Sequence, residues 1–171
     1  MKLVTKSCVL RAPTPDDAPS LAKYANNRNV WLTVRDIFPH PYSLQDARDY
    51  IERIAEQAPP TNFIIDVGGE ACGSIALHGR TDVERISAEL GYWLGEPFWG
   101  RGITTEAVGA ITDYGFRELP LKRIFAIPVA HNVASQRVLE KNGYEREAIM
   151  RNACIKDGKI LDMMLYARIV P

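Results

Sequence analysis

The stretch that decides the fold reads ELGYWLGEPFWGRGITTEA, residues 89–107. It begins with a strand pattern, continues through a loop that contains Gly100 and Gly102, and passes directly into a helix pattern. A helix N-terminus offers unpaired N–H donors and a partial positive charge, and glycines let a ligand approach the backbone closely. The segment therefore favours an anion site at a strand–loop–helix junction, although a plain tight turn has the same pattern.

Two common phosphate-binding motifs are excluded at this junction. The loop lacks the Lys-Ser/Thr pair of a P-loop, so the sequence predicts no site for Mg²⁺ and a triphosphate. It also departs from GxGxxG, because the third residue after Gly102 is Thr105.

Hydrophobic periodicity and turn residues predict the elements on both sides of the junction. Before it, we expect a strand at 7–12, a helix from the cap Thr14 to about Asn26, a helix from the cap Ser43 to about Gln57, and strands at 63–67, 71–77 and 86–94. After it, we expect a helix at 102–118, a strand at 123–129, a helix from the cap Asn132 to about 142, and a hairpin of 144–155 and 159–169. This order predicts an α/β fold with a mixed sheet, in which only the stretch 86–129 requires a parallel pair of strands.

The composition is that of an ordinary globular chain. At about 100–200 residues per domain, 171 residues predict a single domain over 1–171. The 21 basic and 21 acidic residues cancel, which removes the general electrostatic reason to bind nucleic acid. No apolar run is long enough to cross a bilayer, and residues 1–6 lack the apolar core of a secretory signal, so we expect no membrane partner.

The cysteines and histidines do not form a metal site or a disulfide framework in this sequence. Three widely spaced cysteines without a CxxC pair favour reduced thiols in a cytoplasmic protein: Cys8, Cys72 and Cys154. The histidines also lack the spacing of metal ligands, and we expect them at the surface or in turns: His40, His78 and His131. The prediction is therefore that the protein uses no metal.

The junction resembles the acyl-CoA-binding motif of the GNAT superfamily of N-acetyltransferases, Gln/Arg-x-x-Gly-x-Gly/Ala. Gly102 falls on the first glycine of that motif. The sequence departs from it at two positions, because Trp99 stands where Gln or Arg is usual and Thr104 where Gly or Ala is usual.

The run WGRGITTEA, residues 99–107, is similar to the variant found in the ribosomal-protein N-acetyltransferase branch, the RimJ/RimL type. A second signature of that branch is Asn-x-x-Ser-x-x, two hydrophobic residues, and Glu-Lys-x-Gly-aromatic. The run NVASQRVLEKNGY, residues 132–144, matches this signature nearly throughout. The similarity covers the whole chain, from Leu10 and Arg11 to the final hairpin.

The resemblance implies the acyl-CoA N-acyltransferase fold, a mixed central sheet with flanking helices whose two parallel strands splay apart to admit acetyl-CoA. Pro128 fits such a splay, because proline cannot donate to a β ladder. The resemblance also implies that the diphosphate lies on the N–H groups of 101–105 and the pantetheine arm beside 92–94. The implied cofactor-binding residues are Tyr92, Trp93, Leu94, Trp99, Gly100, Arg101, Gly102, Ile103, Thr104, Thr105, Asn132 and Ser135.

Acetyl transfer to nitrogen requires a neutral amine as nucleophile. By strand alternation Glu89 shares a face with Gly91 and Trp93, and the resemblance makes it a candidate general base acting through water. An exposed strand glutamate without a catalytic role is the alternative. The resemblance also makes Ser135 the candidate acid for the leaving thiolate, with Tyr144 as the alternative.

The resemblance implies an acceptor groove beside the first two predicted helices. Their connection carries the candidate substrate-binding residues, although aromatic packing against the core explains them equally well: Trp31, Arg35, Phe38 and Tyr42. Arg137 and Lys141 could meet a coenzyme phosphate, but a solvated helix face is the more common role of such residues.

The function implied is transfer of an acetyl group from acetyl-CoA to a primary amine, by direct attack in a ternary complex. A protein N-terminal α-amine is the favoured acceptor, because at pH 7 about 10–20% of an α-amine but only about 0.04% of a lysine is neutral. The alternatives are a small amine (a polyamine, amino acid or antibiotic) and a non-catalytic acyl-CoA-binding module. The sequence leaves open whether the protein is a monomer or a homodimer.

Overall fold

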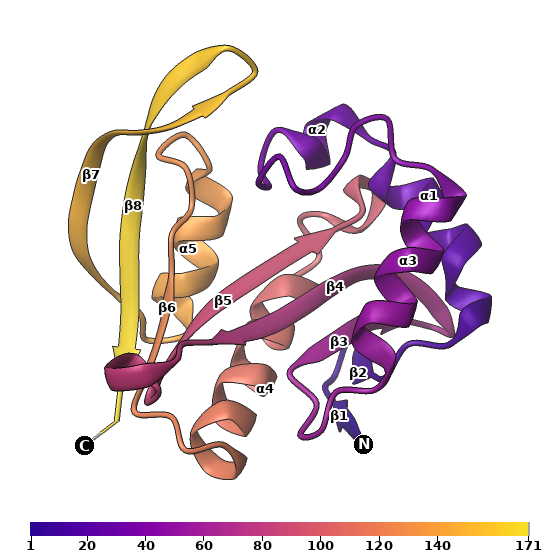
Figure 1. The fold of residues 1–171 in the computed structure, drawn as a ribbon, viewed down its shortest axis with the longest axis horizontal. Coiled ribbons are helices and arrows are strands. Elements are labelled where there is room, and N and C mark those ends of the chain that lie inside the picture. Colours follow the sequence, from indigo (N-terminus) through magenta and orange to yellow (C-terminus); the bar gives the residue numbers. More distant parts are fainter. Residues whose placement is uncertain (171) are drawn as a thin grey trace.

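A computed structural model describes residues 1–170. Eight strands form one sheet in the order β1-β2-β3-β4-β5-β6-β8-β7 (Figure 1). The strands are β1 (Lys2–Val4), β2 (Val9–Arg11), β3 (Asn62–Val67), β4 (Glu70–Gly79), β5 (Ser87–Leu94), β6 (Arg123–Ala126), β7 (Glu145–Lys156) and β8 (Lys159–Ile169). The helices are α1 (Ala18–Ala25), α2 (Arg28–Trp31), α3 (Leu44–Ala55), α4 (Ile103–Glu118) and α5 (Val133–Lys141).

The sheet separates into two arms between β5 and β6, which form its one parallel pair among residues 1–170. They pair only from Ser87 with Arg123 to Glu89 with Phe125. Beyond Glu89 they diverge, and β6 ends at Ala126 instead of continuing to 129 as predicted. The mixed sheet and its splayed parallel strands are confirmed (Figure 1).

Helices cover both faces of the arm that β2 to β5 form. On one face, Tyr50 of α3 lies near Ser74 of β4, and α1 packs beside α3. On the other face, Leu77 of β4 contacts α4 so closely that a Cβ at Gly115 would lie 2.7 Å from its Cδ1. Alternate residues of β4 therefore point to opposite helical layers, and apolar residues such as Ile75 are fully buried between sheet and helices.

Capping residues begin the helices where the sequence predicts. Thr14 N–H donates to Asp17 at 2.7 Å, and Ser43 and Asp46 form a complete capping box before α3. The α5 cap is Asn132, whose Oδ1 accepts from the backbone N–H of Ser135 at 3.1 Å. These local bonds explain why the helix starts were predictable from sequence alone.

One strand and one α-helix were not predicted, and both are too short for a periodic signal. β1 has three residues and forms an edge of the sheet. α2 has four residues and is capped by Asn27, whose Oδ1 accepts from two backbone N–H groups. In the part of the chain that the structure describes, no helix has both the length and the apolarity needed to cross a membrane.

A half-buried charge network fastens β2 to α1 and β3. The guanidinium of Arg11 donates to both carboxylate oxygens of Asp17, at 2.7 and 2.8 Å, and to Asp66 at 2.6 Å. The Arg11 side chain is 15% exposed and that of Asp17 only 7%. Although burial acts to raise the pKa of Asp17, the bonds from Arg11 and Thr14 outweigh it, and the pKa lies below its ordinary value.

We expect Arg11→Met to reduce the free energy of unfolding by about 3 kcal/mol, because it leaves two nearly buried carboxylates without their partner. Urea unfolding at neutral pH measures this change. Asp17 has a lowered folded-state pKa, so its contribution is complete above about pH 4 and is lost as the pH falls through that pKa. The matched control is Arg117→Met, whose exposed pairing with Glu118 predicts a change below about 0.5 kcal/mol. Equal effects of the two substitutions would contradict the network's role.

Candidate active site

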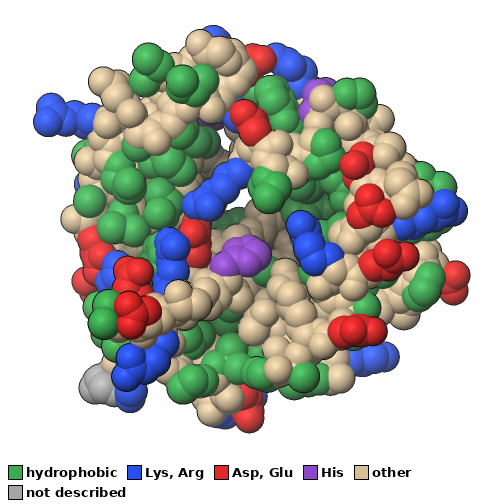
Figure 2. All heavy atoms as spheres, viewed as in Figure 1, with side chains coloured by type: hydrophobic (Ala, Val, Ile, Leu, Met, Phe, Trp, Pro, Cys, Tyr) green, Lys and Arg blue, Asp and Glu red, His purple; other side chains and the backbone are tan. Residues whose placement is uncertain are grey.

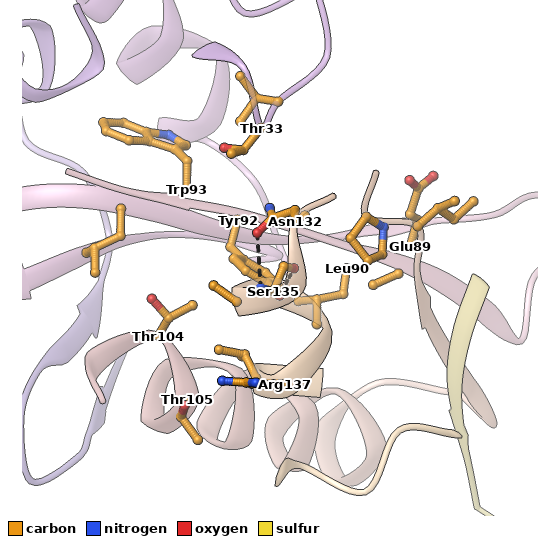
Figure 3. Close-up of a pocket in the computed structure, with 18 of the residues that line it drawn as sticks. Thr33, Glu89, Leu90, Tyr92, Trp93, Thr104, Thr105, Asn132, Ser135 and Arg137 are labelled. Carbon is orange, nitrogen blue, oxygen red and sulfur yellow. Dashed lines mark hydrogen bonds between the residues drawn. The ribbon is translucent and has the colours of Figure 1, made fainter. Parts of the chain in front are cut away.

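The divergence of β5 from β6 opens a cavity of about 850 Å³. Its wall is formed by β5, the loop before α4, the first turn of α4 and the start of α5 (Figure 3). The structure brings together all the cofactor-binding residues predicted from sequence except Arg101. The guanidinium of Arg101 instead lies 5.5 Å from the ring centre of Phe98, whereas its predicted role concerns the backbone N–H.

The loop before α4 presents backbone donors that the protein does not use. Within residues 1–170, the N–H groups of Arg101 to Thr105 have no backbone or side-chain acceptor. Gly100 and Gly102 have φ values of +73° and +78°, and nothing lies within 4 Å of the Cβ position of either. The left-handed backbone requires glycine, and the open space beside it leaves room for a ligand. This arrangement favours a phosphate group at the N-terminus of α4.

Trp99 fixes the other end of this loop. Its Nε1–H donates to the backbone carbonyl of Leu94 at 2.7 Å, while 43% of the residue is exposed. The residue that departs from the usual motif thus ties the loop to the end of β5 through its side chain.

The start of α5 places a hydroxyl pair in the cavity. Ser135 Oγ and Tyr92 Oη lie 2.6 Å apart and share a hydrogen bond. Figure 3 draws Tyr92 on the α5 side of β5 and Trp93 on the opposite side. Burial raises the pKa of Tyr92 to about 12, so its phenol stays protonated at neutral pH and can donate to Ser135.

Tyr144, the alternative acid, lies outside the cavity wall. It is 3% exposed and its hydroxyl is bonded to Thr112 at 2.7 Å. Burial raises its pKa above the ordinary tyrosine value. Its position after α5 therefore serves the core, and the geometry favours Ser135 for the acid role.

A second cavity of about 860 Å³ lies on the α3 side of β5. Figure 2 shows a hollow near the centre of this face with basic side chains at its edge. The two cavities share one wall, formed by Val34, Arg35, Ile37, His78, Gly91, Tyr92 and Trp93. Two ligands could therefore meet beside Gly91, one from each cavity.

Glu89 lies beside this shared wall, on the face predicted by strand alternation. In the register of β4 and β5 it pairs with His78, as Gly91 pairs with Ala76. Its carboxylate forms an ion pair with Arg35 through one oxygen and with Arg80 at 3.4 Å through the other. The Glu89 side chain is 14% exposed, and two guanidinium groups enclose the carboxylate of this predicted base.

Of the predicted substrate-binding residues, three reach the second cavity. Phe38 packs against Trp93 and Tyr42, with ring centres 5.4 and 4.8 Å apart, and Arg35 lines both cavities. Burial raises the pKa of Tyr42 to about 12, so it stays neutral. Trp31 lines neither cavity, which favours the alternative given for it, aromatic packing.

Trp31 instead belongs to a contact between α2 and the tip of the β7–β8 hairpin. Lys156 Nζ lies 3.8 Å from the centre of the Trp31 ring and 2.6 Å from Asp36, and the lysine is 5% exposed. Arg28 and Asp157 form a second ion pair at 2.7 Å. The aromatic ring covers a buried cation, a role that only the tertiary structure reveals.

Basic residues that the sequence analysis did not count among the cofactor-binding residues also line the first cavity. Arg137 and Lys141 line it from α5, where a solvated face was expected. His78 is exposed, as expected, and it also lines both cavities. The available signal for His78 was its place directly after the predicted strand 71–77, which in the structure extends to Gly79 and pairs with β5 so that His78 lies opposite Glu89.

The remaining chemistry of the described residues is simple. Within 1–170, no group of three or more His, Cys, Asp or Glu side chains is arranged to hold a metal ion. Cys8 and Cys72 are buried and free, and burial raises the pKa of Cys72 to about 12. The chemical groups of the site are the free backbone N–H donors before α4, the hydroxyls of Tyr92 and Ser135, and the polar side chains of the wall between the two cavities.

Comparison with known proteins identifies relatives of this arrangement. A family model described as an acetyltransferase (GNAT) domain matches residues 8–145. The chain is 30% identical over 170 residues to an uncharacterized N-acetyltransferase, p20 of Bacillus licheniformis, which covers 96% of this chain and 94% of that protein. It is 29% identical over 182 residues to the ribosomal protein uS5-alanine N-acetyltransferase of Escherichia coli strain K12, covering 100% of this chain and 92% of that protein.

A solved structure supports the same architecture. RimL, a ribosomal-protein α-N-acetyltransferase in complex with coenzyme A, superposes with a TM-score of 0.87, covering 99% of this chain and 98% of its own. At 23% identity this likeness concerns the fold alone.

We expect Trp99→Phe to loosen the loop that Trp99 fixes. The substitution keeps an aromatic ring and removes the N–H donor to Leu94, so the free energy of unfolding should fall by about 1 kcal/mol. Hydrogen exchange measured by mass spectrometry should quicken over 100–105. Trp31→Phe is the control, because Trp31 lies outside the cavities and should leave exchange in this loop unchanged. Unaltered exchange in Trp99→Phe would contradict the anchoring.

Proposed function

The chain belongs to the GNAT family of acetyltransferases, and from this premise we propose that it acetylates a protein N-terminal α-amine by direct attack in a ternary complex. Enzymes of this family are acyltransferases that use acetyl-CoA. The acceptor and the order of attack are the proposed part. A cytoplasmic location, predicted from the sequence, belongs to the same proposal.

The first cavity has the donor groups that acetyl-CoA needs. Free N–H groups at 101–105 suit the diphosphate, and the basic side chains Arg137 and Lys141 suit further phosphate oxygens. The edge of β5 beyond Glu89 has no strand partner on the β6 side, so its backbone can bond to the amides of the pantetheine arm. When bound, acetyl-CoA supplies the thioester that the amine attacks.

Ser135 is the proposed acid for the leaving thiolate. Tyr92 remains protonated at neutral pH and can donate to Ser135 Oγ, which leaves the serine hydrogen free for the sulfur. Asn132 holds the first turn of α5 in place through the N–H of Ser135. Both carboxylate oxygens of Glu89, the base predicted from sequence, are engaged by Arg35 and Arg80.

The observation that carries the proposal is the wall shared by the two cavities at Gly91. An acceptor in the second cavity can reach a thioester in the first without crossing the sheet. An α-amine suits a site with this limited set of bases, because it is deprotonated at a free-energy cost about 3 kcal/mol lower than that of a lysine at pH 7. The printed functions of relatives such as the uS5-alanine enzyme point to the same acceptor class.

The test of this proposal is release of coenzyme A, detected with a thiol reagent, from acetyl-CoA and a panel of acceptors. We expect a peptide with a free N-terminal Ala or Ser to react at least about tenfold faster at pH 7 than the same peptide with a blocked N-terminus and a free lysine. Mass spectrometry of the product locates the acetyl group. Faster turnover of a polyamine would overturn the acceptor assignment, and saturable acetyl-CoA binding without release for any acceptor would indicate a non-catalytic module.

We expect Gly102→Ala to weaken coenzyme A binding by about tenfold, as measured by titration calorimetry. Alanine at a φ of +78° costs about 1 kcal/mol, and relief of that strain moves the donors at 101–105. The matched control is Gly143→Ala, with a φ of +74° at the end of α5 and no place in either cavity wall. Both variants should lose similar stability, but only Gly102→Ala should lose affinity. Equal affinities for the two variants would contradict the phosphate site.

A further inference from the structure

His78 is the most accessible proton acceptor on the wall between the two cavities. It lies near the end of β4, and part of the residue is open to solvent. Among residues 1–170, neither nitrogen of its ring has a hydrogen-bond partner. Its Nε2 lies above Gly91, so that a Cβ built there would be 3.4 Å away. The ring therefore borders the one position of the shared wall without a side chain, where two ligands could meet.

Charged groups from four segments surround this ring. Glu89 faces it from β5, Arg35 from the connection between α2 and α3, Arg53 from α3, and Arg80 lies just after β4. Exclusion of water lowers the pKa of His78 below its ordinary value of about 6.5; Glu89 acts to raise it, whereas Arg35 and Arg53 lower it further. The imidazole is consequently neutral at pH 7, with a lone pair free to accept a proton.

Glu89 competes with His78 for the same role but is less available. Arg35 and Arg80 each pair with a different oxygen of its carboxylate. A carboxylate held between two guanidinium groups offers few free lone pairs to an incoming amine. Its position opposite His78 in the β4–β5 register instead suits it to stabilise an imidazolium once His78 accepts a proton.

We propose that His78 is the general base of acetyl transfer, accepting a proton from the acceptor amine at Nε2, with Glu89 as a positioning residue. This inference rests on the proposed function, because it needs an amine in the second cavity. The sequence pattern assigns no catalytic role to this histidine.

The protons and bonds balance as follows. The amine nitrogen forms a bond to the acetyl carbon while the bond from that carbon to sulfur breaks, and the electron pair of that bond stays on the sulfur. His78 Nε2 accepts one proton that the nitrogen loses, and later releases it to solvent. Ser135 Oγ donates a proton to the sulfur and is resupplied through Tyr92, while the second proton lost by the ammonium acceptor restores this hydroxyl pair through water.

The first test compares kcat/KM of wild type, His78→Gln, Glu89→Gln and His40→Gln over a range of pH with a peptide acceptor. We expect His78→Gln to lose about 100-fold at pH 7 and to lose the fall in rate that His78 protonation causes at low pH. His40→Gln is the matched control, because His40 stacks on Trp31 and lies outside both cavities, and it should keep the wild-type profile. If Glu89→Gln instead abolishes the low-pH fall and His78→Gln retains it, Glu89 is the base and the inference is overturned.

Two further readouts do not depend on turnover alone. In the free protein, NMR titration should give His78 a pKa below about 6.5, its signal being assigned by its disappearance in His78→Gln, and Glu89→Gln should lower that pKa further. Exogenous imidazole should restore part of the activity of His78→Ala. Such rescue would not occur if the substitution had lowered activity by unfolding the protein. A His78 pKa above about 6.5, or no rescue in a folded variant, would contradict the assignment.

These outcomes separate the inference from the proposed function. If wild-type protein binds acetyl-CoA but acetylates no amine, the proposed function fails. If wild-type protein acetylates peptides and His78→Gln keeps its rate and pH profile, only the role of His78 fails.

Discussion

The structure depends on the early end of the parallel pairing between β5 and β6. Three residue pairs hold the strands together, and the backbone of β5 beyond Glu89 then lacks a neighbour on that side. Unpaired backbone groups are costly when buried, so a fold that keeps such an edge must supply water or a ligand to it. Pro128 helps to keep the gap open, since its nitrogen cannot donate, while its carbonyl accepts from Met164 of β8 at 2.9 Å. The cavity, the free loop donors and the approach of α5 all follow from this separation.

The loop before α4 adds free backbone N–H donors next to the unpaired edge of β5. Gly100 and Gly102 turn the chain so that successive N–H groups face the same space, and Trp99 fastens the turn to the carbonyl of Leu94. The donors and the strand edge then form a continuous polar track of backbone groups. Few side chains of this track need to be of a particular type, because the backbone makes the contacts. This explains how Trp99 and Thr104 can depart from the usual motif while the cradle keeps its form.

Sequence reasoning succeeded where the determining interaction is local. The caps at Thr14, Ser43 and Asn132 were predicted, and so was the final hairpin, whose turn residues Asp157 and Gly158 both have positive φ values. It failed where the partner is distant. The arginines that enclose Glu89 come from other segments, the indole of Trp31 covers Lys156 from a hairpin more than a hundred residues later, and His78 reaches the site only because β4 pairs with β5. A single sequence contains no periodic signal for such contacts.

The alternation of side chains along β5 divides the chemistry between its two faces. Tyr92 points toward α5 and bonds to Ser135, whereas Glu89 and Trp93 point toward the α3 side (Figure 3). An acid on one face and a proton acceptor on the other can serve a single reaction because the first cavity, at the open edge of β5, is lined by both Ser135 and His78. A shift of one residue in the β4–β5 register would exchange the two faces and place His78 beside Leu90 instead of Glu89. The register of these two strands is therefore as much a determinant of the site as the identity of any residue in it.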